Sequence, residues 1–240
     1  MNLVLRFLIM AKGLLYILFL ILSFNAFQLR ADEIIKKNLS DFTQLIVQGR
    51  MAVILEEGKQ YTAEIKIKSQ DVDPEKIAFV SKGSQMIIKY TGLSLRELDM
   101  VIVLKVPNLD LIESRQGARI SMASTMRIKS PKINVNVFAG GVITGKFDVD
   151  LADVNVDQGG DIVLVGTAKQ LIANVTTGGS IDAVSFIANN GVVKVRMGGN
   201  ITVNFRETLN ASVFSGGVIK YRGSGTITEK ITLGGSIEKL

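Results

Sequence analysis

Apolar and polar residues alternate along the second half of the chain, and pairs of glycines interrupt the alternation at regular intervals. Runs such as NVNVFAGGVIT, DVNVDQGGDIVLV and VKVRMGGNITVNF place every second residue on the same side of an extended strand. The glycines stand where the chain must turn, because glycine adopts a positive φ at little cost. The pattern predicts an all-β chain whose strands are buried on one face.

The glycine pair occurs six times at a nearly constant spacing. Its first glycines lie 19, 19, 20, 18 and 18 residues apart, at positions 140, 159, 178, 198, 216 and 234. The positions three before and three after each first glycine are always β-branched and apolar: Val137, Ile143, Val156, Ile162, Val175, Ile181, Val195, Ile201, Val213, Ile219, Ile231 and Ile237. This register predicts a repeat in which like residues stack on one another.

The length of the period separates the possible repeat folds. A Gly-Gly pair between alternating strands also suits a hairpin, but a propeller blade built from hairpins takes about 40 to 45 residues. Leucine-rich repeats need leucines and an asparagine at fixed offsets, and these are missing. We therefore predict a parallel β-helix-like stack of 18–20-residue rungs.

Earlier glycines show a weaker form of the same register. They are Gly49 between Ile46 and Ala52, Gly83 between Val80 and Met86, and Gly117 between Ser114 and Ile120. Their spacing is irregular, and Pro107 and Pro131 punctuate the sequence between rungs. We expect residues 32–132 to form irregular N-terminal rungs that act as a looser cap. Residues 133–240 then form the regular Gly-Gly repeats of one continuous domain, 32–240.

The first 31 residues have the composition of an export signal. An apolar run over residues 13–24, GLLYILFLILSF, follows two basic residues and is shorter than the roughly 20 apolar residues that a membrane span needs. We predict a signal peptide over residues 1–31, so that the mature protein begins at Asp32. The intact mass of the exported protein tests this start. The alternatives are an uncleaved N-terminal membrane anchor and translation from Met10.

The composition excludes several kinds of chemistry. The chain has no Cys and no His, so disulfides, thiolate sites, a lipidated Cys and zinc sites built on these residues are ruled out. The net charge of +6 falls to +3 without residues 1–31, because that segment holds three basic residues and no acidic one. The mixed charge indicates a solvated surface rather than nucleic-acid binding. No P-loop or dinucleotide fingerprint is present.

Five aspartates crowd one region of the chain. They are Asp148, Asp150, Asp153, Asp157 and Asp161. Paired carboxylates could serve a polysaccharide-cleaving enzyme or bind calcium. Alternation with valines favours an outward polar face instead, and neither a calcium-binding nonapeptide nor an EF-hand loop is present. We assign no catalytic, cofactor-binding or metal-ligating residue, and keep a carbohydrate-active enzyme that uses the Asp cluster as the alternative function.

The two ends of the region carry a family resemblance. The opening segment LSDFTQLIVQGRMAVILEEGKQYTAEIKI and the closing segment GGVIKYRGSGTITEKITLGGSIEKL resemble the "putative auto-transporter adhesin, head GIN domain" family of exported bacterial proteins. The similarity runs from about Asn38 to Leu240. It implies a β-helix-like stack without catalytic residues. Many members have Ser-Gly-Ala-Ser where this chain has Gly-Gly, and many carry a lipoprotein cysteine that is absent here.

The expected function is that of an exported, non-catalytic binding or structural module of the bacterial envelope, adhesin-like, in the periplasm, at the cell surface or secreted. Its partner would be another envelope or extracellular molecule, with no cofactor and no nucleic acid. The final rung is the expected contact surface for a weak homo-oligomer or for docking. It combines charges that limit strand-edge pairing with apolar residues that remain available, namely Glu229, Lys230, Ile231, Ile237, Glu238, Lys239 and Leu240.

Overall fold

The computed structural model describes residues 33–69, 71–93 and 96–240, and the predicted signal peptide lies outside these residues. The strands are β1 (Glu33–Asn38), β2 (Gln44–Gln48), β3 (Ala52–Glu57), β4 (Thr62–Ile67), β5 (Ile77–Lys82), β6 (Gln85–Tyr90), β7 (Met100–Val106), β8 (Leu111–Arg115), β9 (Arg119–Met122), β10 (Ile128–Phe138), β11 (Val142–Asp157), β12 (Asp161–Thr177), β13 (Ser180–Met197), β14 (Asn200–Ser215), β15 (Val218–Arg222), β16 (Thr226–Ile231) and β17 (Ser236–Lys239). One 3-10 helix, η1, spans Pro74–Lys76.

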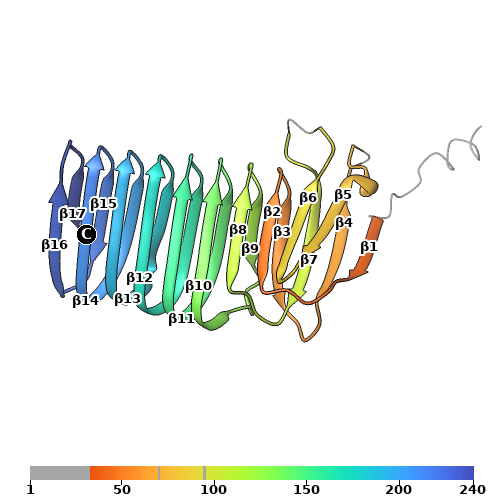
Figure 1. The fold of residues 1–240 in the computed structure, drawn as a ribbon, viewed down its shortest axis with the longest axis horizontal. Helices are drawn as coiled ribbons and strands as arrows, with labels where there is room; N and C mark the ends of the chain where they lie inside the picture. Colours follow the sequence, from red (N-terminus) through yellow and green to blue (C-terminus); the bar gives the residue numbers. More distant parts are fainter. Residues whose placement is uncertain (1–32, 70, 94–95) are drawn as a thin grey trace, which may run out of the picture. The chain divides into compact units, whose positions relative to one another are not determined.

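Parallel pairing between successive rungs builds a solenoid with two main walls (Figure 1). The first wall runs β6, β2, β8, β10, then the second halves of β11 to β14, and ends on β16. The second wall runs β7, β3, β9, then the first halves of β11 to β14, and ends on β15 and β17. This arrangement confirms the predicted all-β stack of rungs.

The N-terminal rungs do not stack in the order of the sequence. Strands β6 and β7 pair on the outer side of β2 and β3, although they follow them in the chain. Antiparallel pairing then finishes this end of the stack, with β5 on β6 and β4 on β7, and β1 on β4. An antiparallel cap interrupts the parallel ladder that another chain could extend.

One of the weaker glycine units was predicted wrongly. Gly83 does not turn a rung but closes the antiparallel hairpin between β5 and β6, in which Lys82 pairs with Gln85. A glycine between two alternating strands serves a hairpin as well as a rung turn, so the sequence around one glycine cannot separate them.

The unit at Gly49 is a rung turn, but its inward residues lie one position later than predicted. Val47 stacks on Ser114, and Val53 stacks on Ile120, whereas Ile46 belongs to an outward column. Three consecutive apolar residues, LIV at positions 45–47, hide the alternation at this point. The unit at Gly117, between Ser114 and Ile120, has the predicted register.

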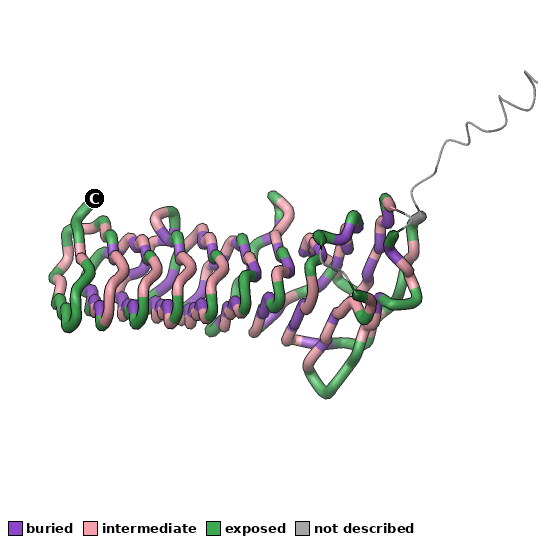
Figure 2. Tube along the Cα trace, turned by 90° about the horizontal axis from the view of Figure 1, so that it is seen from above, coloured by how far each residue is buried: buried purple, intermediate pink, exposed green. Residues whose placement is uncertain are grey.

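The inward positions around the six glycine pairs line the core. In the first five rungs both flanking residues are at most 1% exposed, whereas Ile231 in the last rung is 47% exposed. Ser114 replaces the usual valine in the β8 rung, and its hydroxyl donates to the carbonyl of Ala118 at 2.6 Å. Figure 2 shows buried segments along the stack and mostly exposed chain at its C-terminal end.

The second glycine of each pair lies in contact with the rung before it. A Cβ at Gly179 would lie 2.5 Å from the carbonyl oxygen of Gly160, and one at Gly217 would lie 2.7 Å from that of Gly199. These carbonyls accept the N–H that follows the next pair, as in Ser180 N to Gly160 O at 2.9 Å. Close stacking of the turns therefore requires glycine at this position.

In the last rung, charged residues occupy two inward positions that are apolar in earlier rungs. Glu229 follows Ala211 in one inward column, and Lys239 follows Tyr221 in another. Inward-pointing charges at the end of a sheet oppose the addition of a further strand. In the part of the chain that the structure describes, no helix has the length and apolar character needed to span a membrane.

Candidate functional site

The five aspartates do not form one site. Asp148 and Asp150 lie at the corner where β11 passes from the second wall to the first, whereas Asp161 begins the second-wall part of β12. Asp153 and Asp157 alternate with buried Val154 and Val156 on the first wall, so they face outward. Of the five, Asp148 and Asp150 line a common pocket of about 460 Å³ at this corner, and the other three lie outside it.

Two of these carboxylates are already bound by neighbouring basic side chains. Asp148 accepts from Arg127 at 2.8 Å and from Thr167 at 3.0 Å. Asp150 pairs with Lys169 at 2.8 Å. Within the described residues, no group of three or more carboxylates could hold a metal ion. The polar contacts of the corner are those of a solvated structural surface.

The first wall carries a ladder of side-chain amides that are bonded to one another. Asn174 donates to Asn155 at 2.9 Å, Asn155 to Asn136 at 3.1 Å, and Asn136 to Glu113 at 3.3 Å. Glu113 is 5% exposed and also pairs with Arg115. Because the ladder satisfies its own donors and acceptors, it stabilises the wall and offers few groups to a ligand.

We call the edge of the solenoid at which the chain passes from the first wall to the second the turn edge. A pocket of about 630 Å³ opens on this edge. Its volume falls within the range of about 300–1,000 Å³ that ligand pockets occupy. The main side chains of this turn pocket are Arg50, Tyr90, Glu97, Leu98, Gln116 and Arg119, and turns at residues 49, 92, 117 and 140 complete the lining. It lies near the N-terminal cap.

The residues that line the turn pocket come from one long turn and from its shorter neighbours. Tyr90 ends β6 and Met100 begins β7, whereas β8 and β9 are joined by only three residues, 116–118. The N–H of Leu98 donates to the carbonyl of Arg50 at 2.8 Å and so fastens the long turn to the turn between β2 and β3. The next turn contributes two small residues, Ala139 and Gly140, to the lining.

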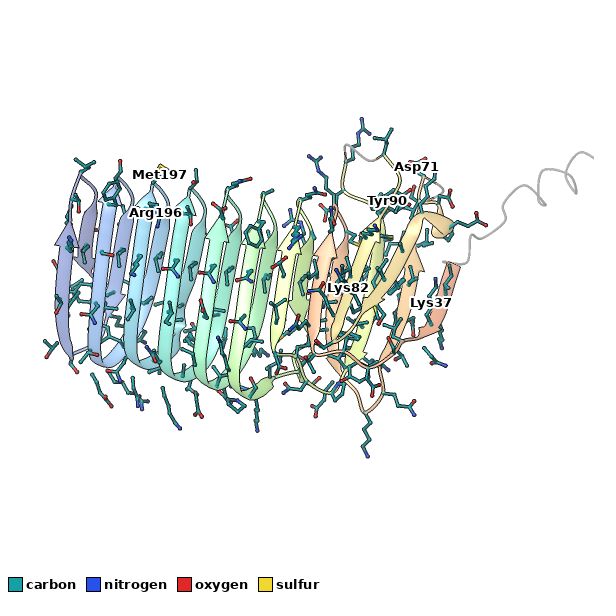
Figure 3. All side chains as sticks on the ribbon, viewed as in Figure 1. Lys37, Asp71, Lys82, Tyr90, Arg196 and Met197 are labelled. Atoms are coloured by element: carbon teal, nitrogen blue, oxygen red, sulfur yellow. The ribbon has the colours of Figure 1, made fainter. Side chains whose placement is uncertain are left out.

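Two side chains of the pocket, Tyr90 and Gln116, accept hydrogen bonds from neighbouring residues. The hydroxyl of Tyr90 accepts from the N–H of Asp73 at 3.4 Å, and a Cβ at Gly92 would lie 2.5 Å from the Tyr90 ring. The carbonyl of the Gln116 side chain accepts from Gln48 at 3.1 Å. Figure 3 shows Tyr90 toward the turn edge, on which Arg196 and Met197 lie farther along the stack.

Two backbone conformations in the pocket are uncommon for residues with side chains. Gln116 has φ 53° and Ala139 has φ 50°. Side-chain residues in the left-handed region cost energy and are found often at ligand sites and tight turns. Gln158, before the regular pair Gly159 and Gly160, has φ 58° as well, whereas in the rung of Gly178 and Gly179 both positive φ values belong to glycine.

The charged groups of the pocket form a weak, exposed ion pair. Arg119 Nε lies 3.2 Å from Glu97 Oε1, and the side chains are 58% and 56% exposed. Exposed pairs of this kind contribute about 0–1 kcal/mol, so a ligand can displace one partner. Arg50 adds a second guanidinium, and its stem lies over Gly117, where a Cβ would be 3.1 Å from Arg50 Cγ.

The turn pocket offers hydrogen-bond donors, one acceptor carboxylate and an aromatic ring, but no second carboxylate for acid–base catalysis. This composition suits the binding of a polar ligand. The sequence did not reveal the site, because its residues come from four turns spread between positions 49 and 140. The available signal was the presence of Arg50, Gln116 and Arg119 at turns that lack a full glycine pair.

Solved structures of three bacterial proteins have the same fold. A "putative adhesin" from Bacteroides fragilis is 19% identical with a TM-score of 0.76, covering 88% of this chain and 98% of that one. A "putative adhesin" from Parabacteroides merdae is 15% identical with a TM-score of 0.69, covering 88% and 100%. A "putative lipid binding protein" from Parabacteroides distasonis is 17% identical with a TM-score of 0.66, covering 87% and 96%.

A family model matches most of the solenoid, over residues 41–225. This range contains the turn pocket and all regular rungs except the last. No curated protein matches the sequence. The chain belongs to the family described as "putative auto-transporter adhesin, head GIN domain".

Proposed function

We propose that the protein is an exported, non-catalytic binding module of the bacterial envelope, adhesin-like, and that it holds its ligand in the turn pocket. The observation that carries the proposal is the pocket itself, about 630 Å³ in volume, with Arg119, Glu97 and Tyr90 among its walls. The basic, apolar leader and the adhesin description of the family support export.

Binding fits the described surface better than catalysis does. A carbohydrate-active enzyme that used the Asp cluster would need two carboxyl groups facing one substrate. Asp148 and Asp150 share a pocket at the corner, but each is bonded there to a basic side chain, and Asp161 lies on the second wall. The enzyme alternative predicts loss of activity in Asp150→Asn or Asp157→Asn with folding intact.

Binding can be measured by exposing the labelled protein to a printed panel of bacterial and host glycans. The wild type should bind a subset of the panel. Arg119→Ala should weaken that binding about fivefold or more, because it removes a charged donor from the pocket.

The matched control is Arg196→Ala, which removes an exposed arginine from the same turn edge several rungs away (Figure 3). It should bind like the wild type. Mass spectrometry of the bound glycan after incubation should show it intact. Cleaved glycan, or equal losses in the two arginine variants, would contradict a binding function of the turn pocket.

A further inference from the structure

We propose that the ligand of the turn pocket is an acidic saccharide, whose carboxylate takes the place of Glu97 on Arg119. This inference rests on the proposed function and adds the chemical class of the ligand. The resting ion pair is the first observation behind it. Glu97 Oε1 and Arg119 Nε lie 3.2 Å apart on side chains that are both more than half exposed.

A carboxylate is the group that this guanidinium already holds. Arginine presents a planar set of N–H donors that match a carboxylate in a bidentate arrangement. Since the exposed pair is worth little, a carboxylate delivered with additional contacts competes with the Glu97 side chain. The Arg50 side chain, which lies over Gly117, contributes further positive charge to the same pocket.

The remaining groups suit the hydroxyls and the ring of a sugar. The carbonyl of the Gln116 amide is occupied by Gln48, and its NH₂ group makes no hydrogen bond to any residue that the structure describes. The Tyr90 hydroxyl accepts from the N–H of Asp73 at 3.4 Å, and its ring packs on the turn at Gly92. A donor amide and an aromatic ring beside an arginine provide contacts that a simple anion cannot use.

The test compares two sugars that differ in one group. Methyl β-D-glucuronide and methyl β-D-glucoside are titrated into the full chain labelled with nitrogen-15, and the amide signals of Gly49, Gly92, Gly117 and Gly140 report on the pocket. The glucuronide should bind about three- to fivefold more tightly than the glucoside, because an exposed charge-assisted contact contributes up to about 1 kcal/mol.

Two variants should act in opposite directions. Arg119→Gln removes the charge and keeps a planar amide, so it should lower the glucuronide affinity to that of the glucoside. Glu97→Gln removes the competing carboxylate, so it should tighten the glucuronide and leave the glucoside within about twofold. If the ion pair has only a structural role, both variants should bind both sugars more weakly.

The remaining outcomes separate the two proposals. Equal affinities for the two sugars, with shifts at the pocket glycines, would overturn the acidic ligand and leave the binding function standing. Acetate or inorganic phosphate binding as tightly as the glucuronide would overturn the saccharide in favour of a simple anion. If neither the two sugars nor a glycan bound on the printed panel shifts the four glycine signals, both proposals fail.

Discussion

The two glycines of a rung turn have different roles at the residue scale. Gly178 has φ +66° and nothing within 4 Å of the place where a Cβ would stand, whereas a Cβ at Gly179 would lie 2.5 Å from the backbone of the preceding rung. Gly178→Ala should therefore cost about 1–2 kcal/mol, the strain of a left-handed alanine. Gly179→Ala should cost more, about 3 kcal/mol, because it adds a backbone clash. Urea denaturation that gives equal losses would contradict this assignment.

The inward register gives a second prediction at this scale. Ile181 and Ile201 are buried, with 1% and 0% exposure, so Ile181→Asp and Ile201→Asp place an unpaired charge in the core and should unfold the stack. Lys194 is exposed on the first wall, and Lys194→Asp should change the free energy of unfolding by about 0.5 kcal/mol or less. Similar thermal shifts in all three variants would refute the register.

Prediction from the sequence succeeded where the alternation is unbroken. Val137 and Ile143 could be placed inward because the alternation around them is regular, and their stacking partners repeat them. It failed at Gly49 because Leu45, Ile46 and Val47 are all apolar, so the sequence does not show which of them face inward. The inward residues of a strand can be predicted only where they alternate with polar ones.

At the scale of elements, the N-terminal cap was the least predictable part. The insertion of β6 and β7 outside β2 and β3 reverses the order of rungs, and nothing local in these strands specifies which neighbour they pair with. The turn that joins these two inserted strands contributes Gly92, Glu97 and Leu98 to the lining of the turn pocket. The pocket therefore depends on long-range pairing that periodicity does not encode.

The last rung carries a prediction about association. Glu229 and Lys239 continue inward columns that are apolar in earlier rungs, and this placement should restrict growth of the stack by strand addition. The double variant Glu229→Ala and Lys239→Leu should associate end to end at concentrations where the wild type does not. Analytical ultracentrifugation measures the difference, with the outward double variant Lys230→Ala and Glu238→Ala as control.

The same sedimentation experiment can contradict a protective role of Glu229 and Lys239. If the inward and outward double variants sediment alike, the inward charges do not protect the edge. The weak homo-oligomer expected through this rung stays a prediction, which the same wild-type sedimentation data test. Deletion of residues 227–240 should abolish such association and expose the Ile219 rung to aggregation.

At the scale of the whole solenoid, the cap and the last rung form opposite ends (Figure 1). The residues that line the turn pocket belong to the rungs next to the cap. The walls between them are regular, and on the first wall the Asn ladder bonds to itself. A rigid stack with a pocket at its turn edge can present a bound ligand at a fixed distance from its other end. Function is thus expected at the cap end rather than along the walls.

Hydrogen–deuterium exchange of the full chain, with and without the glycan that binds it best on the printed panel, tests this location most directly. Ligand binding in the turn pocket should slow exchange in the turns around residues 49–51, 96–100, 116–119 and 139–141, and leave the walls and the last rung unchanged. Protection spread along the first wall, or confined to residues 226–240, would contradict a ligand site at the turn edge.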